Sequence, residues 1–117
     1  MPKLSITPEM IAAAYDYLLT TPPFCDWNLP ESEEINFVVY KSVANRGDWC
    51  RINGRHRIRI SSRYAKTTVS LIETVAHEMI HLHEDHNNCS GAGQHSAAFN
   101  MWAHEVCEIH GWDAALF

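Results

Sequence analysis

Two histidines and a glutamate past the middle of the chain have the types and spacing of a hydrolytic metal site. His77, Glu78 and His81 form the stretch HEMIH, which matches H-E-x-x-H within a segment of helical periodicity. On a helix the two histidines lie about 40° apart around the axis and about 6 Å apart along it, so both imidazoles can reach one ion. Neutral imidazole is a good zinc ligand, and a carboxylate beside it can take a proton from a metal-polarised water. The motif predicts a zinc-dependent hydrolase with Glu78 as its general base.

A catalytic zinc usually has a third protein ligand, and here that ligand must come from further along the chain. His95 fits best, because the preceding residues 87–94 include two glycines that allow the chain to reverse. The apolar residues that follow His95 at helical spacing share its face, which predicts that this face packs inward. His104 would point the opposite way and is expected to be exposed. The predicted ligand set is therefore His77, His81 and His95.

Other residues near the motif remain as alternatives for two roles. Glu105 and Glu108 are glutamate alternatives for the third ligand, although they lie about 15–20 Å further along the last helix. Cys89 lies in the loop near the predicted ligands and is expected to be a bystander. The group that stabilises the oxyanion is left open among three candidates: Tyr64, His83 and His86.

Local signals place these residues on helices. Thr7 followed by Pro8 is a good N-cap and first-turn pair, and predicts a helix over 8–19. Its apolar stripe would consist of Met10, Ile11, Ala14, Tyr17 and Leu18. A long helix over about 68–85 would carry the HEMIH motif, with apolar faces from Val69, Ile72, Val75, Ala76, Met79 and Ile80. A last helix over about 96–109 is followed by Gly111, a natural residue to end it.

Strand signals lie between the first and second helices. Residues 35–40 are rich in β-branched and aromatic side chains, and Asn53-Gly54 favours a type I′ hairpin turn between 48–52 and 55–61. That turn places Trp49 opposite Ile58, with one face toward the core. On the other face it pairs Asp48 with Arg59 and Cys50 with Arg57. The element order predicts an α+β domain with an N-terminal helix, a three-stranded antiparallel sheet, an active-site helix and a C-terminal helix. At 117 residues, the chain has the length of a single domain.

Charge is strongly segregated along the chain. Residues 41–66 carry eight Lys and Arg side chains against one Asp, whereas residues 67–117 carry none and seven acidic residues. On the predicted hairpin, Arg55, Arg57 and Arg59 share the face opposite the core. We expect that this block contacts a polyanion such as single-stranded DNA, or else pairs with the acidic residues at 31–34.

The remaining composition bears on the cellular compartment. No apolar run approaches the roughly 20 residues of a membrane-spanning helix. The first residues lack an apolar stretch followed by a small-residue cleavage site, and the four cysteines form no C-x-x-C pair. These features predict a cytoplasmic protein with reduced thiols and no membrane partner.

The stretch 58–112 resembles the SprT-like (Spartan-type) zinc metalloprotease family. The resemblance rests on IRIS at 58–61, ETVAHEMIH at 73–81 and HSAAF at 95–99. The last is similar to the family's H-G-x-x-F element, with Ser96 in place of the usual glycine.

This resemblance implies a small gluzincin-like protease core. Zinc would be held by His77, His81 and His95, with Glu78 as general base. Family members are associated with repair of DNA–protein crosslinks, so the resemblance also implies a DNA-associated protein substrate. A rival hypothesis is a non-catalytic binding module, in which zinc joins two helices and the basic hairpin contacts nucleic acid. A structural zinc site tends to be closed by a fourth protein ligand, whereas a catalytic one stays open.

Overall fold

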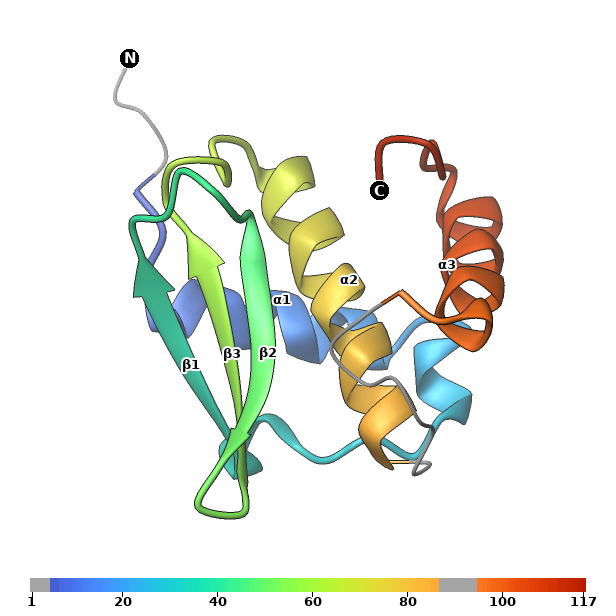
Figure 1. Cartoon of the computed structure of the whole chain (residues 1–117), viewed down its shortest axis with the longest axis horizontal. Coiled ribbons are helices and arrows are strands. Elements are labelled where there is room, and N and C mark those ends of the chain that lie inside the picture. The colour runs from blue at the N-terminus through green and yellow to red at the C-terminus, as the bar shows by residue number, and fades with distance from the viewer. Residues whose placement is uncertain (1–4, 87–94) are drawn as a thin grey trace.

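Three α-helices and one three-stranded sheet account for most of the residues that the structure, a computed structural model, describes: 5–86 and 95–117 (Figure 1). In chain order the elements are α1 (Pro8–Leu19), the 3-10 helices η1 (Phe24–Asp26) and η2 (Ser32–Glu34), β1 (Ile35–Tyr40), β2 (Gly47–Ile52), β3 (Arg55–Ser61), α2 (Thr68–His86) and α3 (Ala97–His110). The predicted α+β class is confirmed. No helix in the described ranges is both long and apolar enough to cross a membrane.

Capping residues delimit the helices where the sequence predicts. The Thr7 side chain accepts a hydrogen bond from the Met10 backbone N–H at 3.2 Å, and Ser96 likewise caps α3 through the Phe99 N–H at 3.1 Å. Gly111 ends α3 with φ of 77°, a left-handed conformation that glycine adopts without strain. The start of α3 therefore depends on the residue directly after His95.

The β2–β3 hairpin forms in the predicted register. Asn53 and Gly54 both have positive φ, as a type I′ turn requires, and Trp49 pairs with Ile58. The other predicted pairs are also confirmed, including Asp48 with Arg59. This register points Ile58, which is fully buried, toward the helices.

The sheet is mixed, which corrects the predicted antiparallel arrangement. Its order is β1-β3-β2, and β1 runs parallel to β3, with Tyr40 opposite Ser61. The chain therefore does not turn back beside β1. Residues 41–46 instead cross the end of β3 and enter β2 at the far edge of the sheet (Figure 1).

Buried Ser61 holds this crossing segment at the end of β3. Its hydroxyl donates to the Ser42 carbonyl at 2.7 Å and accepts from the Ser42 N–H at 3.1 Å, and its own N–H donates to the Arg46 carbonyl at 2.7 Å. These hydrogen bonds give partners to backbone N–H and carbonyl groups of the crossing segment that no strand pairs. They set where β2 begins, beside α2.

The core lies between the sheet and the helices α1 and α2. Ile11, Leu18, Val75 and Met79 are fully buried in it, as predicted, together with Tyr15. Two residues assigned to apolar faces from periodicity lie outside the core: Tyr17 is 52% exposed and Val69 is 59% exposed. Both occur near a helix end, where the helical face extends past its packing partner.

Candidate metal centre

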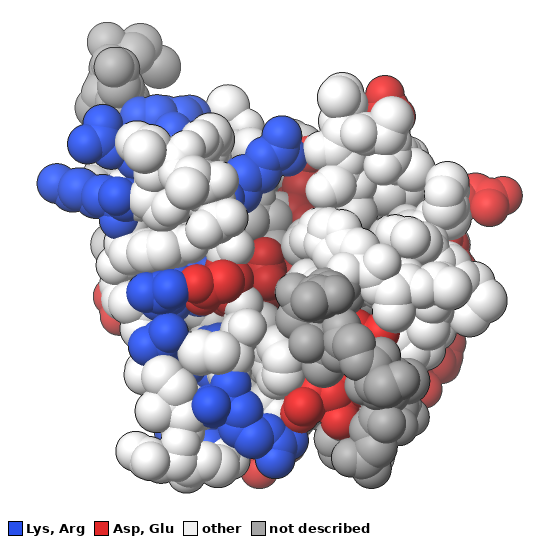
Figure 2. Space-filling view, in the orientation of Figure 1, with Lys and Arg blue, Asp and Glu red and all other residues white. Residues whose placement is uncertain are grey.

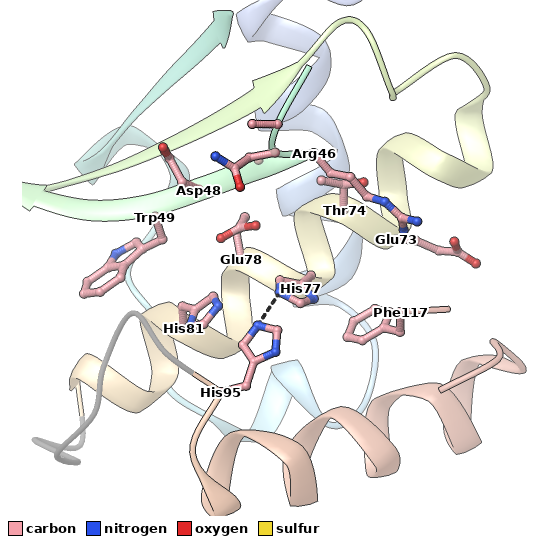
Figure 3. Close-up of a pocket in the computed structure, with 13 residues that line it drawn as sticks. Arg46, Asp48, Trp49, Glu73, Thr74, His77, Glu78, His81, His95 and Phe117 are labelled. Carbon is pink, nitrogen blue, oxygen red and sulfur yellow. Dashed lines mark hydrogen bonds between the residues drawn. The ribbon is translucent and has the colours of Figure 1, made fainter. Parts of the chain in front are cut away.

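Three histidine side chains converge between α2 and the start of α3 (Figure 3). One ring nitrogen from each of His77, His81 and His95 lies within 4.8 Å of the others. The Nε2 atoms of His77 and His95 are 3.1 Å apart. The structure therefore brings together the three ligands that the sequence predicts.

Phe99 forms the floor beneath these rings. It is 2% exposed and stacks on His95, with ring centroids 4.3 Å apart and planes 3° apart. Its centroid also lies 4.4 Å from that of His81 and 5.1 Å from that of His77. One aromatic side chain on the first turn of α3 therefore contacts all three imidazoles and restricts their rotation.

The three histidines are positioned to bind a metal ion, and one pair of them has the spacing of a zinc site. Two nitrogens bound tetrahedrally at about 2.0–2.1 Å from one Zn²⁺ lie about 3.3–3.4 Å apart, close to the separation of the His77 and His95 Nε2 atoms. Burial, and then the neighbouring histidines, lower the pKa of His77 to about 3 and that of His81 to about 4. Both rings are therefore neutral near pH 7 and carry the lone pair that a metal requires.

Glu78 lies between the histidines and β2, with its carboxylate in the cavity (Figure 3). Its side chain is 4% exposed. Burial, with a smaller contribution from the nearby Asp48 carboxylate, raises the pKa of Glu78 to about 8. A carboxyl group whose pKa lies near neutrality can both take and return a proton under physiological conditions.

The cavity of about 370 Å³ that holds these groups has a wall that sequence reasoning missed. The C-terminal residues fold back over α2, and the Phe117 ring lies 5.3 Å from the His77 ring. Arg46 Nη1 donates to the Leu116 carbonyl at 3.0 Å and so ties this segment to the start of β2. The C-terminal segment therefore packs against the first predicted ligand and limits the room around its ring.

The opposite wall is the beginning of β2. Asp48 and Trp49 line the cavity there, and Asp48 forms a bidentate ion pair with Arg59 on the neighbouring strand. The Arg59 guanidinium also lies 4.4 Å from the centroid of the Tyr40 ring. The hairpin register predicted that Asp48 and Arg59 would pair, but nothing local showed that this pair would lie beside Glu78.

A family comparison agrees with this geometry. The SprT-like family model matches residues 17–115, which include every element from the last turns of α1 to the end of α3. The chain belongs to the SprT-like family. No curated protein matches it. Family membership makes this a metalloprotease-like domain, and the convergent histidines lie within the matched range.

The two glutamate alternatives for the third ligand, and His104, lie away from the metal centre of this SprT-like domain. His104, Glu105 and Glu108 are exposed on α3, outside the histidine group. The prediction that His104 is exposed is confirmed. Cys89 and the predicted loop over 87–94 lie outside the described residues.

Two of the three oxyanion candidates do not line the cavity. The Tyr64 hydroxyl donates to the Val43 carbonyl, and the His83 ring stacks on Trp27, with centroids 4.0 Å apart. His83 lies on another face of α2, as its position two residues after His81 requires. The side chain of His86 lies outside the described part of the chain.

Proposed function

We propose that this SprT-like domain is a zinc-dependent endopeptidase. His77, His81 and His95 would hold the metal, and Glu78 would act as general base. The observation that carries the proposal is the position of a buried carboxylate beside three convergent imidazole nitrogens, on the wall of an open cavity. A bound Zn²⁺ would polarise a water molecule and the scissile carbonyl.

The residues of the chain account for the proton transfers. Glu78 takes a proton from the attacking water and later delivers it to the leaving amine. Burial raises the pKa of Glu78 in the metal-free chain, and a metal ion held by the histidines would favour the carboxylate form that accepts the proton. The Glu78 side chain needs no large movement between the steps, because α2 and β2 enclose it.

β2 supports a protein as the substrate class. It is an edge strand of the described sheet, and its first residues form a wall of the cavity. An extended peptide can pair with the free edge of such a strand through backbone hydrogen bonds. That pairing would present successive peptide bonds to Glu78 without requiring one particular side chain.

A metal site with only a structural role is less well supported. Among the described residues the group contains three histidines and no fourth His, Cys, Asp or Glu ligand. A structural zinc site is usually closed by four protein ligands, and it has no use for a buried carboxylate beside it. The absence of a fourth ligand among the described residues and the presence of Glu78 together favour catalysis.

Digestion of an unstructured protein substrate tests the proposal. The zinc-loaded parent should cleave it, and both chelation and the Glu78→Gln substitution should abolish cleavage. Glu78→Gln keeps the size of the side chain but cannot accept the proton, so zinc content should remain equal to that of the parent. Cleavage by Glu78→Gln at the parent rate would refute the general-base role. A parent that binds zinc but cleaves no protein, with or without added DNA, would favour the binding module.

We also propose that single-stranded DNA contacts the sheet end of this domain. Of the three arginines predicted to contact DNA, Arg59 is paired with Asp48, and Arg55 donates to the Glu33 carbonyl at 2.9 Å. The third, Arg57, is partly buried. Three exposed basic residues that follow the ends of β1 and β3 form no ion pair among the described residues. These are Lys41, Arg63 and Lys66, which we call the basic end.

The parallel pairing of β1 and β3 explains why the basic end forms. Lys41 follows β1, and Arg63 and Lys66 follow β3, so the three exposed side chains emerge at the same end of the sheet. Figure 2 shows Lys and Arg side chains over the sheet half of the molecule and none over the α3 half. A cluster of exposed cations is suited to phosphate contacts, and the acidic remainder of the chain would confine DNA to this end.

A further inference from the structure

A buried carboxylate outside the proposed reaction lies one turn beyond the second histidine. Glu84 follows His81 by three residues and His77 by seven, so it shares their face of α2. It is fully buried, and its Oε2 atom accepts a hydrogen bond from the Ser96 hydroxyl. Its Oε1 atom is buried without a hydrogen-bond partner among the described residues.

Burying Glu84 costs stability. The described residues place no Lys or Arg in an ion pair with it, and residues 67–117 contain no basic side chain other than histidine. A buried carboxylate with one unsatisfied oxygen is less favourable than an apolar side chain of similar volume. The positive end of the α3 dipole offsets part of that cost. A role in core stability alone therefore does not explain the residue.

The hydrogen bond between Glu84 and Ser96 indicates that Glu84 holds two helices together. The Ser96 hydroxyl donates to Glu84 and also accepts the Phe99 N–H at 3.1 Å, so one side chain joins α2 to the first turn of α3. His95 is the residue directly before Ser96, and Phe99 is the floor under the His95 ring. Displacing Ser96 would therefore displace both the third ligand and the ring that supports it.

We propose that Glu84 is a positioning residue that sets His95 for metal binding through the Ser96 hydroxyl. The inference rests on the proposed metal site and names what holds its third ligand in place. His77 and His81 are already fixed relative to each other by one helix. His95 comes from a different segment, so its position depends on contacts between elements. The Glu84–Ser96 hydrogen bond joins the two segments at the residue directly after that ligand.

Titration of the metal-free chain with Co²⁺, followed by visible absorption, tests this role. Ser96→Gly removes the hydroxyl but leaves a residue that caps a helix nearly as well, so α3 should keep its start. Loss of an outer-shell contact typically weakens metal binding about tenfold to hundredfold. We expect Ser96→Gly to lose Co²⁺ affinity by that factor. Its visible absorption band should also be weaker, because water replaces His95 on the ion. Ser96→Thr, which retains the hydroxyl, should restore both affinity and spectrum.

Two controls separate positioning from general destabilisation. Thr7→Gly makes the same kind of change at the cap of α1, away from the cavity, and should leave Co²⁺ affinity unchanged. Glu84→Gln should weaken binding, and combining it with Ser96→Gly should add less than the sum of the two effects, because both substitutions act on one contact. Urea unfolding of each metal-free variant measures stability separately.

Three results would overturn the inference. These are parent-like Co²⁺ affinity and spectrum in Ser96→Gly, failure of Ser96→Thr to restore them, and full additivity of Glu84→Gln with Ser96→Gly. A parent that binds Co²⁺ but cleaves no protein would refute the proposed enzyme and leave the positioning role intact. A parent that binds no Co²⁺ would overturn both.

Discussion

The His77 and His95 Nε2 atoms face each other 3.1 Å apart, although His77 lies on α2 and His95 lies just before α3. A metal ion held by these two nitrogens would accept a lone pair from each ring. The three histidines are therefore already grouped in the metal-free chain. Its geometry depends on the packing of α3 against α2 as much as on the HEMIH motif.

The first prediction concerns the third ligand. His95→Ala should reduce zinc affinity strongly, because it removes one of three convergent nitrogens, whereas His104→Ala should not, because that residue is exposed on α3. Zinc content after dialysis against a weak chelator measures the difference. Unchanged zinc content in the His95 variant would show that another residue is the third ligand.

The aromatic floor of the site gives a second prediction. Phe99→Leu should lower the free energy of unfolding by roughly 1–2 kcal/mol and also weaken zinc binding, because Phe99 contacts all three histidine rings. Phe24→Leu is a matched control. Phe24 is 1% exposed and packs on Trp27, away from the cavity. Phe24→Leu should lower the free energy of unfolding by a similar amount without changing zinc affinity. Equal zinc affinity in the two variants would contradict the role of Phe99.

A third prediction concerns the start of β2. A Cβ atom at Gly47 would lie 2.7 Å from the Arg59 carbonyl oxygen and 3.2 Å from a Thr74 methyl carbon, so Gly47→Ala forces β2 away from β3 and α2. We expect Gly47→Ala to lower the free energy of unfolding, measured in urea, by about 1–3 kcal/mol. Gly54→Asn, in a turn where asparagine tolerates positive φ, should cost less than about 1 kcal/mol. Comparable losses in both would argue against a close approach at Gly47.

The fourth prediction addresses DNA. Fluorescence anisotropy should detect weak binding of single-stranded DNA, and the logarithm of its affinity should fall with the logarithm of salt concentration with a slope of about −2, as expected for roughly three phosphate contacts. Reversing Lys41, Arg63 and Lys66 to glutamate should abolish binding while leaving zinc content intact.

A single-residue comparison controls for net charge in that experiment. Lys66→Glu and Arg51→Glu change the charge equally, but Arg51 is already paired with Asp85 at 2.7 Å. Lys66→Glu should therefore weaken binding more. Equal effects would point to net charge alone, and a parent without DNA binding at low salt would refute the proposal.

Much of this domain follows from local signals in the sequence. Thr7, Ser96 and Gly111 cap helices, and Asn53-Gly54 sets the hairpin register, because each acts through its own backbone conformation or a neighbour within a few residues. The HEMIH motif belongs to the same class, since helical geometry alone places His77 and His81 on one face. These features were predictable without knowledge of any distant contact.

The tertiary structure decided the remainder. β1 pairs parallel to β3 because residues 41–46 cross the sheet end, and the Ser61 contacts that hold this crossing join residues 15 or more positions apart. The Phe117 wall and the Glu84–Ser96 contact likewise join segments that meet only when α3 packs on α2. Spacing could identify His95 as a ligand, but only this packing brings its ring to His77 and shows what holds it there. Such contacts have no local signal, because their energy is gained only after the chain has closed the intervening loops.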